Sequence, residues 1–281
     1  MLRTIAIVGA VLLLGFTAFA GEELTLKGST TILPIAQLAA EAFAEFHPDL
    51  AISVQGGGSG TGIAALIDGA CDIADASRGM KPSEWDKAVS NGVQPYHWFI
   101  ANDGIAIIVH PSNPIERLTL GQVEAIYTGK VTDWKELGGP ERKIVPVSRD
   151  TASGTYEVFK GIVLGDEEPG VRGMLYQSSN AAVADTVART PGGIGYVGLG
   201  YLNPSVKALA VAGEEGVYLL PTEESVIAGT YPIFRPLFMI TNGFPKGVIR
   251  RFILFVLSDE GQRIVQEAGY VPIRRLAPCE D

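Results

Sequence analysis

The sequence predicts an α/β protein of two compact lobes, each with a mostly parallel sheet flanked by helices. Short apolar runs of strand length alternate along the chain with segments whose apolar residues recur every three or four positions, which is the spacing of a helix. This alternation is typical of parallel sheets whose crossover helices cover their faces. The chain has 281 residues, which is enough for two lobes with a hydrophobic core each.

The first twenty residues are a predicted secretory signal peptide. They carry one early positive charge, Arg3, then an apolar stretch from Ile5 to Phe16, and then Ala18-Phe19-Ala20, which matches the small-residue pattern of a cleavage site. A membrane anchor is the alternative, because the apolar stretch approaches the shortest length that spans a bilayer. The polar segment that follows favours cleavage near Ala20. We therefore expect a mature chain that is exported to the periplasm.

Strands and helices alternate through the N-terminal part of the mature chain. The residues Leu24-Thr25-Leu26 predict the first strand, and apolar residues at helical spacing predict a helix from Ile35 to Phe46. The run from Ala51 to Gln55 predicts a second strand. A glycine cluster follows it and leads into a helix with apolar residues at 63–67, and residues 71–76 predict a third strand.

The same alternation continues towards the C-terminus. Residues 105–110 and 143–148 predict further strands, with a helix over 120–129 between them. Residues 246–269 predict a helical end of the chain, because their large apolar residues fall on one helix face: Val248, Phe252, Phe255 and Val256. A glycine at the end of this segment and a proline just beyond it end the helical pattern.

The mature chain is acidic, which limits its partners. The whole sequence has 22 lysine and arginine residues against 31 aspartate and glutamate residues, a net charge of −9, and the leader holds only one of the basic residues. Nucleic acid and anionic membranes need a basic surface, so the composition argues against both as partners. Any site for a small anion must therefore be built locally, against the overall charge.

Four predicted helix starts share small hydroxyl residues accompanied by glycine or arginine. They are Gly28-Ser29-Thr30-Thr31, Gly58-Ser59-Gly60-Thr61, Ser77-Arg78 and Ser153-Gly154-Thr155, the last with Arg149 four residues upstream. A helix N-terminus leaves backbone N–H groups unpaired and carries a partial positive charge, so it holds an oxyanion without any lysine. Glycine lets the anion approach the backbone, and a hydroxyl adds a further hydrogen-bond donor.

The ordinary role of such residues is to cap helices, so a single start of this kind is usually structural. Three observations favour a ligand here. The hydroxyls come in clusters, whereas a single hydroxyl is enough to cap a helix. Each cluster follows a predicted strand, at the edge where open α/β sheets bind ligands. A guanidinium, which suits oxyanions, accompanies two of the clusters. We expect the starts to converge on one small anion.

Other site chemistries fit the sequence poorly. A P-loop pattern is absent, and Thr61 stands where a hydrolase elbow around Ser59 would need glycine. Residues 193–198 match G-x-G-x-x-G, but they lack the context of a strand followed by a helix, and we interpret them as a turn-rich coincidence. The histidines show no metal-ligand spacing: His47, His97 and His110. We expect no metal and no cofactor.

Several segments together resemble a known family. "GSTTILPIA", "QGGGSGTGI", "DIADASR", "VSRDTASGTYEVF", "SSNAAVADTVARTPGGIGYVGLGYL", "YPIFRPLF" and "FVLSDEGQRIVQEAGYVPI" occur in the order found in the periplasmic phosphate-binding proteins of high-affinity phosphate ABC transporters, which are type II periplasmic binding proteins. The resemblance implies two lobes joined by a two-stranded hinge, with residues 24–102 and 234–281 in lobe one and 103–233 in lobe two. Binders of tungstate, molybdate or sulfate share this fold and stay as alternatives.

The resemblance also implies a set of phosphate-binding residues. By position they are Thr30, Thr31, the backbone of Ile32, Ser59, Ser77, Arg149, Ser153, Gly154 and Thr155. Ser77 departs from the family pattern, in which an aspartate accepts the proton of hydrogen phosphate and so rejects sulfate. Asp75 and Asp150 lie nearby in the sequence, and substitution of one of them for that aspartate is an alternative, but we interpret each as a turn or surface residue. Arg78 either assists at the site or forms a salt bridge at the lobe edge.

We therefore expect a non-catalytic, monomeric receptor in the periplasm that delivers inorganic phosphate to the membrane permease of an ABC importer. A secreted phosphatase that uses Ser59 or Ser153 is an alternative, although no recognisable motif supplies the base that such a nucleophile needs. A sensor or adhesin with the same fold is another. The pairing of Cys71 and Cys279 is left open by the sequence.

Overall fold

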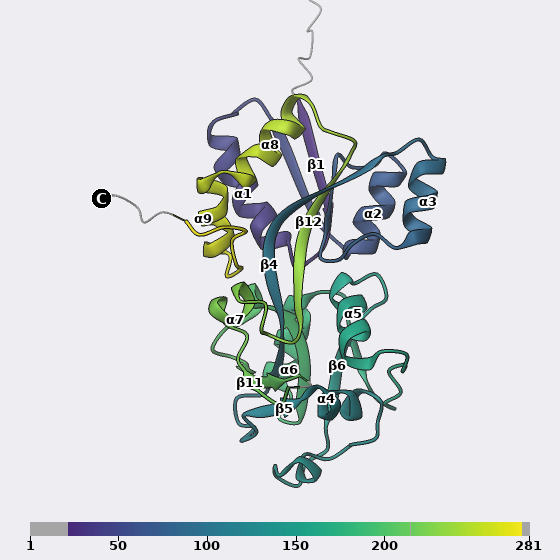
Figure 1. Ribbon diagram of the computed structural model, residues 1–281, viewed down its shortest axis with the longest axis vertical. Coiled ribbons are helices and arrows are strands. Elements are labelled where there is room, and N and C mark those ends of the chain that lie inside the picture. The colour runs from purple at the N-terminus through teal and green to yellow at the C-terminus, as the bar shows by residue number, and fades with distance from the viewer. Residues whose placement is uncertain (1–21, 214, 277–281) are drawn as a thin grey trace, which may run out of the picture.

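Two long strands connect the two halves of the molecule. The computed structural model describes residues 22–213 and 215–276, so the predicted signal peptide and Cys279 lie outside the described residues. In Figure 1, β4 (Pro95–Val109) and β12 (Phe234–Asn242) run from the upper group of helices into the lower group. The predicted α/β fold class and two-lobed arrangement are confirmed.

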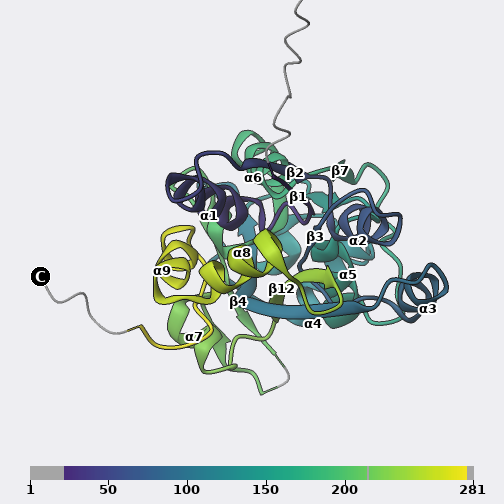
Figure 2. The same cartoon turned by 90° about the horizontal axis from the view of Figure 1, so that it is seen from above.

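The upper lobe combines the beginning and the end of the chain. Its strands are β1 (Glu23–Gly28), β2 (Ala51–Gly56) and β3 (Ile73–Ala76), and its helices are α1 (Leu33–Glu45), α2 (Ser59–Ile67), α3 (Pro82–Ser90), α8 (Gly247–Leu257) and α9 (Asp259–Glu267). Figure 2 shows α1, α8 and α9 on one side of these strands and α2 and α3 on the other. Two separate apolar clusters fill the two sides, one around Leu26 and Phe252 and one around Ile63 and Ile240.

The lower lobe is the middle of the chain. Its strands are β5 (Arg117–Thr119), β6 (Val145–Arg149), β7 (Leu175–Gln177), β8 (Gly193–Gly198), β9 (Lys207–Ala208), β10 (Ala210–Ala212) and β11 (Tyr218–Leu219). Its helices are α4 (Leu120–Tyr127), η1 (Trp134–Leu137), α5 (Gly154–Phe159), which continues into η2 (Lys160–Leu164), α6 (Asn180–Arg189), η3 (Leu199–Tyr201) and α7 (Glu223–Ile227). The core of this lobe contains the stacked rings of Phe159 and Tyr196.

The main sheet is parallel within each lobe and antiparallel where the lobes join. Its strand order is β2-β1-β3-β12-β4-β8-β6-β7, with β9 also paired to β4, and β11-β10-β5 form a smaller sheet. β1 is parallel to β2 and β3, and β6 is parallel to β7 and β8, whereas β4 is antiparallel to β12 and β8. β12 runs against β4 because it returns the chain to the upper lobe. The predicted lobe boundaries, 102/103 and 233/234, fall within β4 and at the start of β12, and they stay a prediction.

The helical end of the chain differs from the single pattern seen in the sequence. It is broken at Ser258, whose extended backbone separates α8 from α9 and whose Oγ accepts a hydrogen bond from the N–H of Gly261 at 3.2 Å. A Cβ on Gly261 would lie 2.2 Å from the carbonyl oxygen of Phe255, so glycine is required for this tight corner. Val248, Phe252 and Val256 are buried as expected, and Phe255 is half-buried.

The interpretation of residues 193–198 as turn-rich was wrong. They form β8, a fully buried strand between β4 and β6. A Cβ on Gly195 would lie 2.7 Å from Cγ1 of Val183 on α6, so the glycine allows the helix to pack close to the sheet. Within the described residues, no helix combines the length and the apolar character that crossing a membrane requires.

Candidate anion-binding site

The four hydroxyl-bearing segments meet between the lobes. Each follows a strand, namely β1, β2, β3 or β6. The predicted hydroxyl residues are nearly or completely buried: Thr30, Thr31, Ser59, Ser77, Ser153 and Thr155. Oγ1 of Thr31 lies 3.0 Å from Oγ1 of Thr155, and Oγ of Ser59 lies 3.2 Å from Oγ of Ser77. The structure thus brings together hydroxyls that are more than a hundred residues apart in the sequence.

The first segment is fixed by its own backbone and by β3. The N–H of Ser29 donates to the carbonyl oxygen of Asp75 at 2.8 Å, and Oγ of Ser29 accepts from the N–H of Thr31 at 3.1 Å. The N–H of Ile32, predicted to bind the anion, donates to the carbonyl oxygen of Ser29 at 3.2 Å, and its side chain is buried in the core. Ile32 therefore anchors the start of α1 in this structure.

The two Ser-Gly-Thr segments touch each other. A Cβ on Gly154 would lie 2.3 Å from Oγ of Ser59 and 2.6 Å from Oγ of Ser77, so α5 begins directly against the upper lobe. The N–H of Gly60 donates to the carbonyl oxygen of Ala152 at 3.0 Å, and Lys81 forms an ion pair with Glu157 at 2.8 Å. These contacts hold the two lobes together across the site.

Arg149 is a buried cation with one free donor. Its Nε donates to the carbonyl oxygen of Gln177 at 3.0 Å and its Nη2 to that of Ser178 at 2.9 Å. Its Nη1 is buried and has no hydrogen-bond partner among the described residues. Burial lowers the pKa of this guanidinium from its ordinary value, and the nearby Asp150 opposes that shift. Because an unpaired buried charge is costly, this group favours an anionic ligand.

Ser153 plays a capping role at the same time. Its Oγ accepts from the N–H of Tyr156 at 3.2 Å and so caps α5, which leaves its hydroxyl hydrogen available. In the same way, Oγ of Ser59 accepts from the N–H of Ser77 at 3.0 Å.

A second buried arginine was not predicted as part of the site. Arg235 on β12 pairs with Asp103 on β4, with Nη2 2.7 Å from Oδ2. Its Nη1 donates to Oγ1 of Thr155 at 3.0 Å and its Nη2 to Oγ1 of Thr31 at 3.1 Å, so it contacts one threonine from each lobe. Burial raises the pKa of Asp103, and Arg235 together with the N–H of Leu199 opposes the rise. The available signal was a charged residue within an otherwise apolar strand.

Asn180 was also missed. It is the first residue of α6 and is fully buried. Its Nδ2 donates to Oγ1 of Thr30 at 3.1 Å and to Oγ1 of Thr31 at 3.0 Å, and the hydroxyl of Tyr201 donates to the carbonyl oxygen of Thr30. The residue sits in a segment used for the family resemblance, but its spacing from the threonines gave no reason to place it beside them.

Comparison with known proteins identifies the family. A sequence profile of the PBP superfamily domain matches residues 17–260. The phosphate-binding protein PstS of Bacillus subtilis (strain 168) is 34% identical over 264 residues, which cover 93% of this chain and 84% of the relative. This chain belongs to the phosphate-binding protein family of the PBP superfamily. The PstS protein of Pseudomonas aeruginosa (strain PAO1) is 33% identical over 271 residues, which cover 89% of this chain and 83% of that one.

Solved structures of the family have the same fold. A crystal structure from Clostridium perfringens, of a substrate-binding protein assigned to a phosphate ABC transporter and with bound phosphate, is 35% identical, with a TM-score of 0.81 over 90% of this chain and 100% of that one. An ABC-type phosphate transport receptor from Vibrio cholerae is 31% identical, with a TM-score of 0.69 over 88% of this chain and 99% of that one. The predicted family resemblance is confirmed.

Two acidic residues next to the site behave differently. Asp150 accepts from the N–H of Ala152 at 3.1 Å in a turn, as expected. The interpretation of Asp75 as a turn or surface residue was wrong, because it lies within β3 and is 1% exposed. Its Oδ1 has no partner among the described residues, and burial raises its pKa to about 8. Ser77, which by the resemblance stands in the place of the family's aspartate, has its Oγ 3.2 Å from Oγ of Ser59.

The raised pKa of Asp75 has a consequence for stability. Between pH 3.8, its ordinary pKa, and about pH 8, the Asp75 carboxyl group keeps a proton in the folded protein that it loses in the unfolded chain. The stabilisation that this proton gives to the folded state is therefore complete below pH 4 and is lost as the pH rises through 8. Asp75→Asn is expected to be more stable than the parent at pH 8 by at least about 1.4 kcal/mol, the free energy of one pKa unit, and by less at pH 4. Urea unfolding at both values measures this, with Asp150→Asn as the control. Parallel pH profiles for Asp75→Asn and the parent would contradict it.

Arg78 forms the salt bridge that was one of its two predicted roles, and its Nε is buried without a partner among the described residues. Its Nη1 and Nη2 each donate to the Glu84 carboxylate at 2.7 Å, so its charge is paired at the start of α3. Among the described residues, no cluster of three or more histidine, cysteine, aspartate or glutamate side chains is arranged to hold a metal ion. Of the two buried arginines at the hydroxyl cluster, Arg235 is paired with Asp103, whereas Nη1 of Arg149 has no partner among the described residues.

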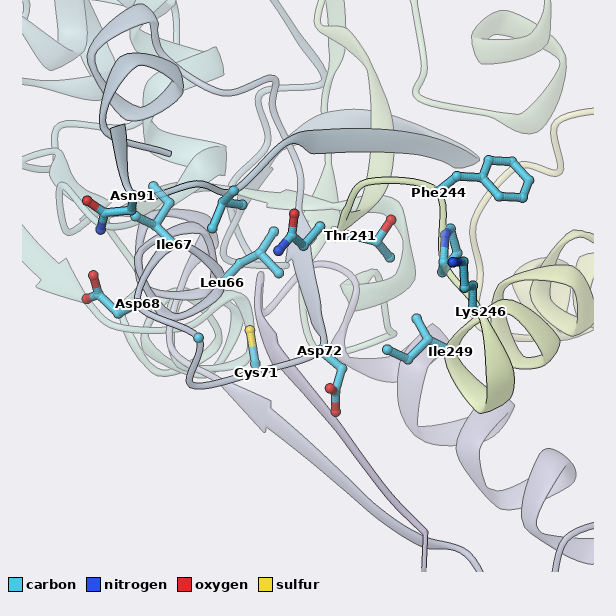
Figure 3. A pocket seen from close by; sticks show the side chains of 14 residues that line it. Leu66, Ile67, Asp68, Cys71, Asp72, Asn91, Thr241, Phe244, Lys246 and Ile249 are labelled. Atoms are coloured by element: carbon cyan, nitrogen blue, oxygen red, sulfur yellow. The ribbon is translucent and has the colours of Figure 1, made fainter. Parts of the chain in front are cut away.

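A separate cavity lies at the other end of α2. Figure 3 shows the side chains around it, which come from the end of α2, the segment before β3, the segment after α3, the end of β12, the segment that leads into α8 and the start of α8. It has a volume of about 770 Å³. About 13 Å of helix separates it from Ser59. Its lining includes the carboxylates of Asp68 and Asp72 and one ammonium group, that of Lys246, which disfavours an anion there.

Proposed function

We propose that this chain is an extracytoplasmic receptor that binds inorganic phosphate between its two lobes and delivers it to the membrane permease of an ABC importer. The observation that carries the proposal is the convergence of buried hydroxyls from both lobes next to Arg149, whose Nη1 has no partner among the described residues. The relatives named above are phosphate-binding proteins, and the Clostridium perfringens structure holds phosphate. Together they favour phosphate over tungstate, molybdate or sulfate.

Each proposed ligand has a distinct part. Arg149 supplies the countercharge through Nη1, and the hydroxyls act as donors to the phosphate oxygens: Thr30, Thr31, Ser59, Ser77, Ser153 and Thr155. Gly154 has no side chain and so lets the anion reach the start of α5, and the backbone at Ile32 lies at the start of α1. Because the site is buried between the lobes, its hydrogen bonds act in a low-dielectric environment and are stronger than in water.

The lobe division is part of this proposal. Residues 24–102 and 234–281 form one lobe, residues 103–233 the other, and β4 with β12 forms the hinge. The contacts of Gly60 with Ala152 and of Lys81 with Glu157 are those of a closed arrangement. A monomer in the periplasm, released by cleavage near Ala20, fits this role.

The surroundings of the two serines favour a receptor over a phosphatase. A serine nucleophile needs an adjacent base to remove its proton. Oγ of Ser59 contacts the backbone and hydroxyl of Ser77, and Oγ of Ser153 contacts the N–H of Tyr156. Within residues 22–213 and 215–276, neither serine is hydrogen-bonded to a histidine, lysine or carboxylate.

The direct test removes the countercharge. Arg149→Ala is expected to weaken phosphate binding at least tenfold, because a charge-assisted hydrogen bond contributes about 1.5–3 kcal/mol. Calorimetric titration of residues 21–281, refolded to remove bound anion, measures the affinity for phosphate, sulfate, molybdate and tungstate. Arg189→Ala, an exposed residue of α6, removes the same charge away from the site and is expected to bind as the parent does. Equal affinities of the two variants would take Arg149 out of the site, and a parent that binds none of the four anions would refute the function.

A further inference from the structure

Three threonine hydroxyls of the site accept hydrogen bonds from residues outside the predicted set. Asn180 donates through Nδ2 to Oγ1 of Thr30 and of Thr31, at 3.1 and 3.0 Å. Arg235 donates to Oγ1 of Thr31 and of Thr155, at 3.1 and 3.0 Å. All five residues are nearly or completely buried, so these contacts are not exchanged with bulk water.

The direction of these hydrogen bonds is fixed. The N–H of Gly198 donates to Oδ1 of Asn180 at 3.3 Å, which turns the amide nitrogen towards the threonines. An arginine has only donors, and Arg235 is held in place by Asp103 through Nε and Nη2, at 2.8 and 2.7 Å. Each threonine oxygen therefore accepts these hydrogen bonds with its own lone pairs, and its single hydrogen has to point in another direction.

Two of the three hydroxyl hydrogens have no acceptor in the described part of the chain. Thr30 donates to no side chain or backbone group among the described residues. Thr31 and Thr155 lie 3.0 Å apart, so one hydrogen of this pair bridges the two oxygens and the other has no acceptor in the described part of the chain. An anion whose oxygens carry no proton is the partner that such donors match.

We infer that Asn180 and Arg235 are positioning residues that leave one hydroxyl hydrogen of Thr30 and one of the Thr31–Thr155 pair as donors towards the bound anion. The inference rests on the proposed function and specifies the form of phosphate that the site takes. Together with Nη1 of Arg149 these hydrogens make three donor groups, which match the three unprotonated oxygens of hydrogen phosphate, whereas dihydrogen phosphate has two. The charged and titratable groups near these hydroxyls are Arg149, the pair of Arg235 and Asp103, and Asp75, whose pKa burial raises to about 8. Asp75 is present in every variant compared below, so its titration does not contribute to the difference between them.

Asn180→Asp reverses the polarity at nearly constant shape. The new carboxylate oxygen accepts the hydrogens of Thr30 and Thr31, whose lone pairs then face the anion. An acidic residue is favourable in the first turn of a helix, so α6 is expected to form. Ala181→Asp is the matched control, because it adds the same charge at the next residue, which is exposed.

The test is calorimetric titration with inorganic phosphate from pH 5 to pH 8.5. At pH 8, where hydrogen phosphate predominates, Asn180→Asp is expected to bind at least thirtyfold more weakly than Ala181→Asp, with a gap that narrows towards pH 5, where dihydrogen phosphate can donate to the threonines. A constant gap, or none, would overturn the inference while leaving the proposed function intact. A parent that fails to bind phosphate at every pH would refute both.

A second variant tests the same inference without adding charge. Thr30→Val removes the donated hydrogen and keeps the shape of the side chain. It is expected to weaken phosphate binding at least fivefold in the parent. In the Asn180→Asp variant the expected effect is less than twofold, because there the hydrogen of Thr30 already donates to the new carboxylate. Equal effects of Thr30→Val in the two backgrounds, or an unchanged affinity in the parent, would overturn the role of Asn180.

Discussion

Replacing Gly154 with alanine is expected to weaken phosphate binding at least a hundredfold without lowering the stability of the fold. The added methyl group would lie 2.3 Å from Oγ and 3.0 Å from Cβ of Ser59, and 2.6 Å from Oγ of Ser77. Oγ of Ser59 cannot move aside without losing its hydrogen bond from the N–H of Ser77. Both serines belong to the other lobe, so the clash appears only when the lobes close. Calorimetric titration measures the affinity, and thermal unfolding measures the stability.

The chain offers two glycine controls for this variant. Gly154 begins α5 with helical backbone, where alanine is at least as favourable as glycine. A Cβ on Gly60, the glycine of the other Ser-Gly-Thr segment, would approach other groups no closer than 3.4 Å, and one on Gly161 would meet nothing within 4 Å. Gly60→Ala and Gly161→Ala are expected to bind phosphate within about threefold of the parent. A Gly154→Ala variant that binds equally well would show that binding does not need this contact between the lobes.

Replacing Arg235 with methionine is expected to lower the free energy of unfolding by about 3–5 kcal/mol. Asp103, which is fully buried, would keep its carboxylate without a counterion. The missing guanidinium would raise the pKa of Asp103 further, so the loss is expected to be larger at pH 8 than at pH 5, where the carboxyl group can bind a proton. Urea unfolding at the two pH values measures both effects.

An exposed ion pair provides the control for this second variant. Arg251 pairs with Glu22 at 3.1 Å, and both side chains are about half exposed. Arg251→Met is expected to cost less than about 1 kcal/mol. Adding Asp103→Asn to Arg235→Met is expected to restore part of the stability, since no buried charge is then left unpaired. If Arg235→Met costs no more than Arg251→Met, the buried pair does not stabilise the fold in the way described.

The parts of the site that the sequence predicted are those whose signal is local. A hydroxyl cluster after a strand and before a helix occupies a few consecutive residues, so the segments at Thr30, Ser59 and Ser153 are visible in the sequence alone. Arg235 and Asn180 act on threonines that lie far away in the sequence, and no spacing rule connects them. Their position depends on how the sheet is ordered, which the order of strands along the chain does not specify.

The errors have a similar physical origin. Glycines at 193–198 have the composition of a turn, but they serve close packing of α6 against β8, which only the folded arrangement makes evident. Asp75 has a polar side chain within a short apolar strand, and no local pattern indicated that β3 would lie between β1 and β12. In both cases tertiary packing outweighs the usual preference of the residue type.

The ribbon formed by β4 and β12 restricts how the lobes can move. These strands stay in register from Gly104 opposite Phe234 to Pro95 opposite Asn242, with one irregularity between Leu237 and Phe238. Hydrogen bonds along the ribbon resist sliding of one lobe past the other, so we expect any relative motion of the lobes to bend or twist the ribbon without changing its register. The empty and loaded shapes that the proposed receptor offers to a permease would then differ in bend and twist.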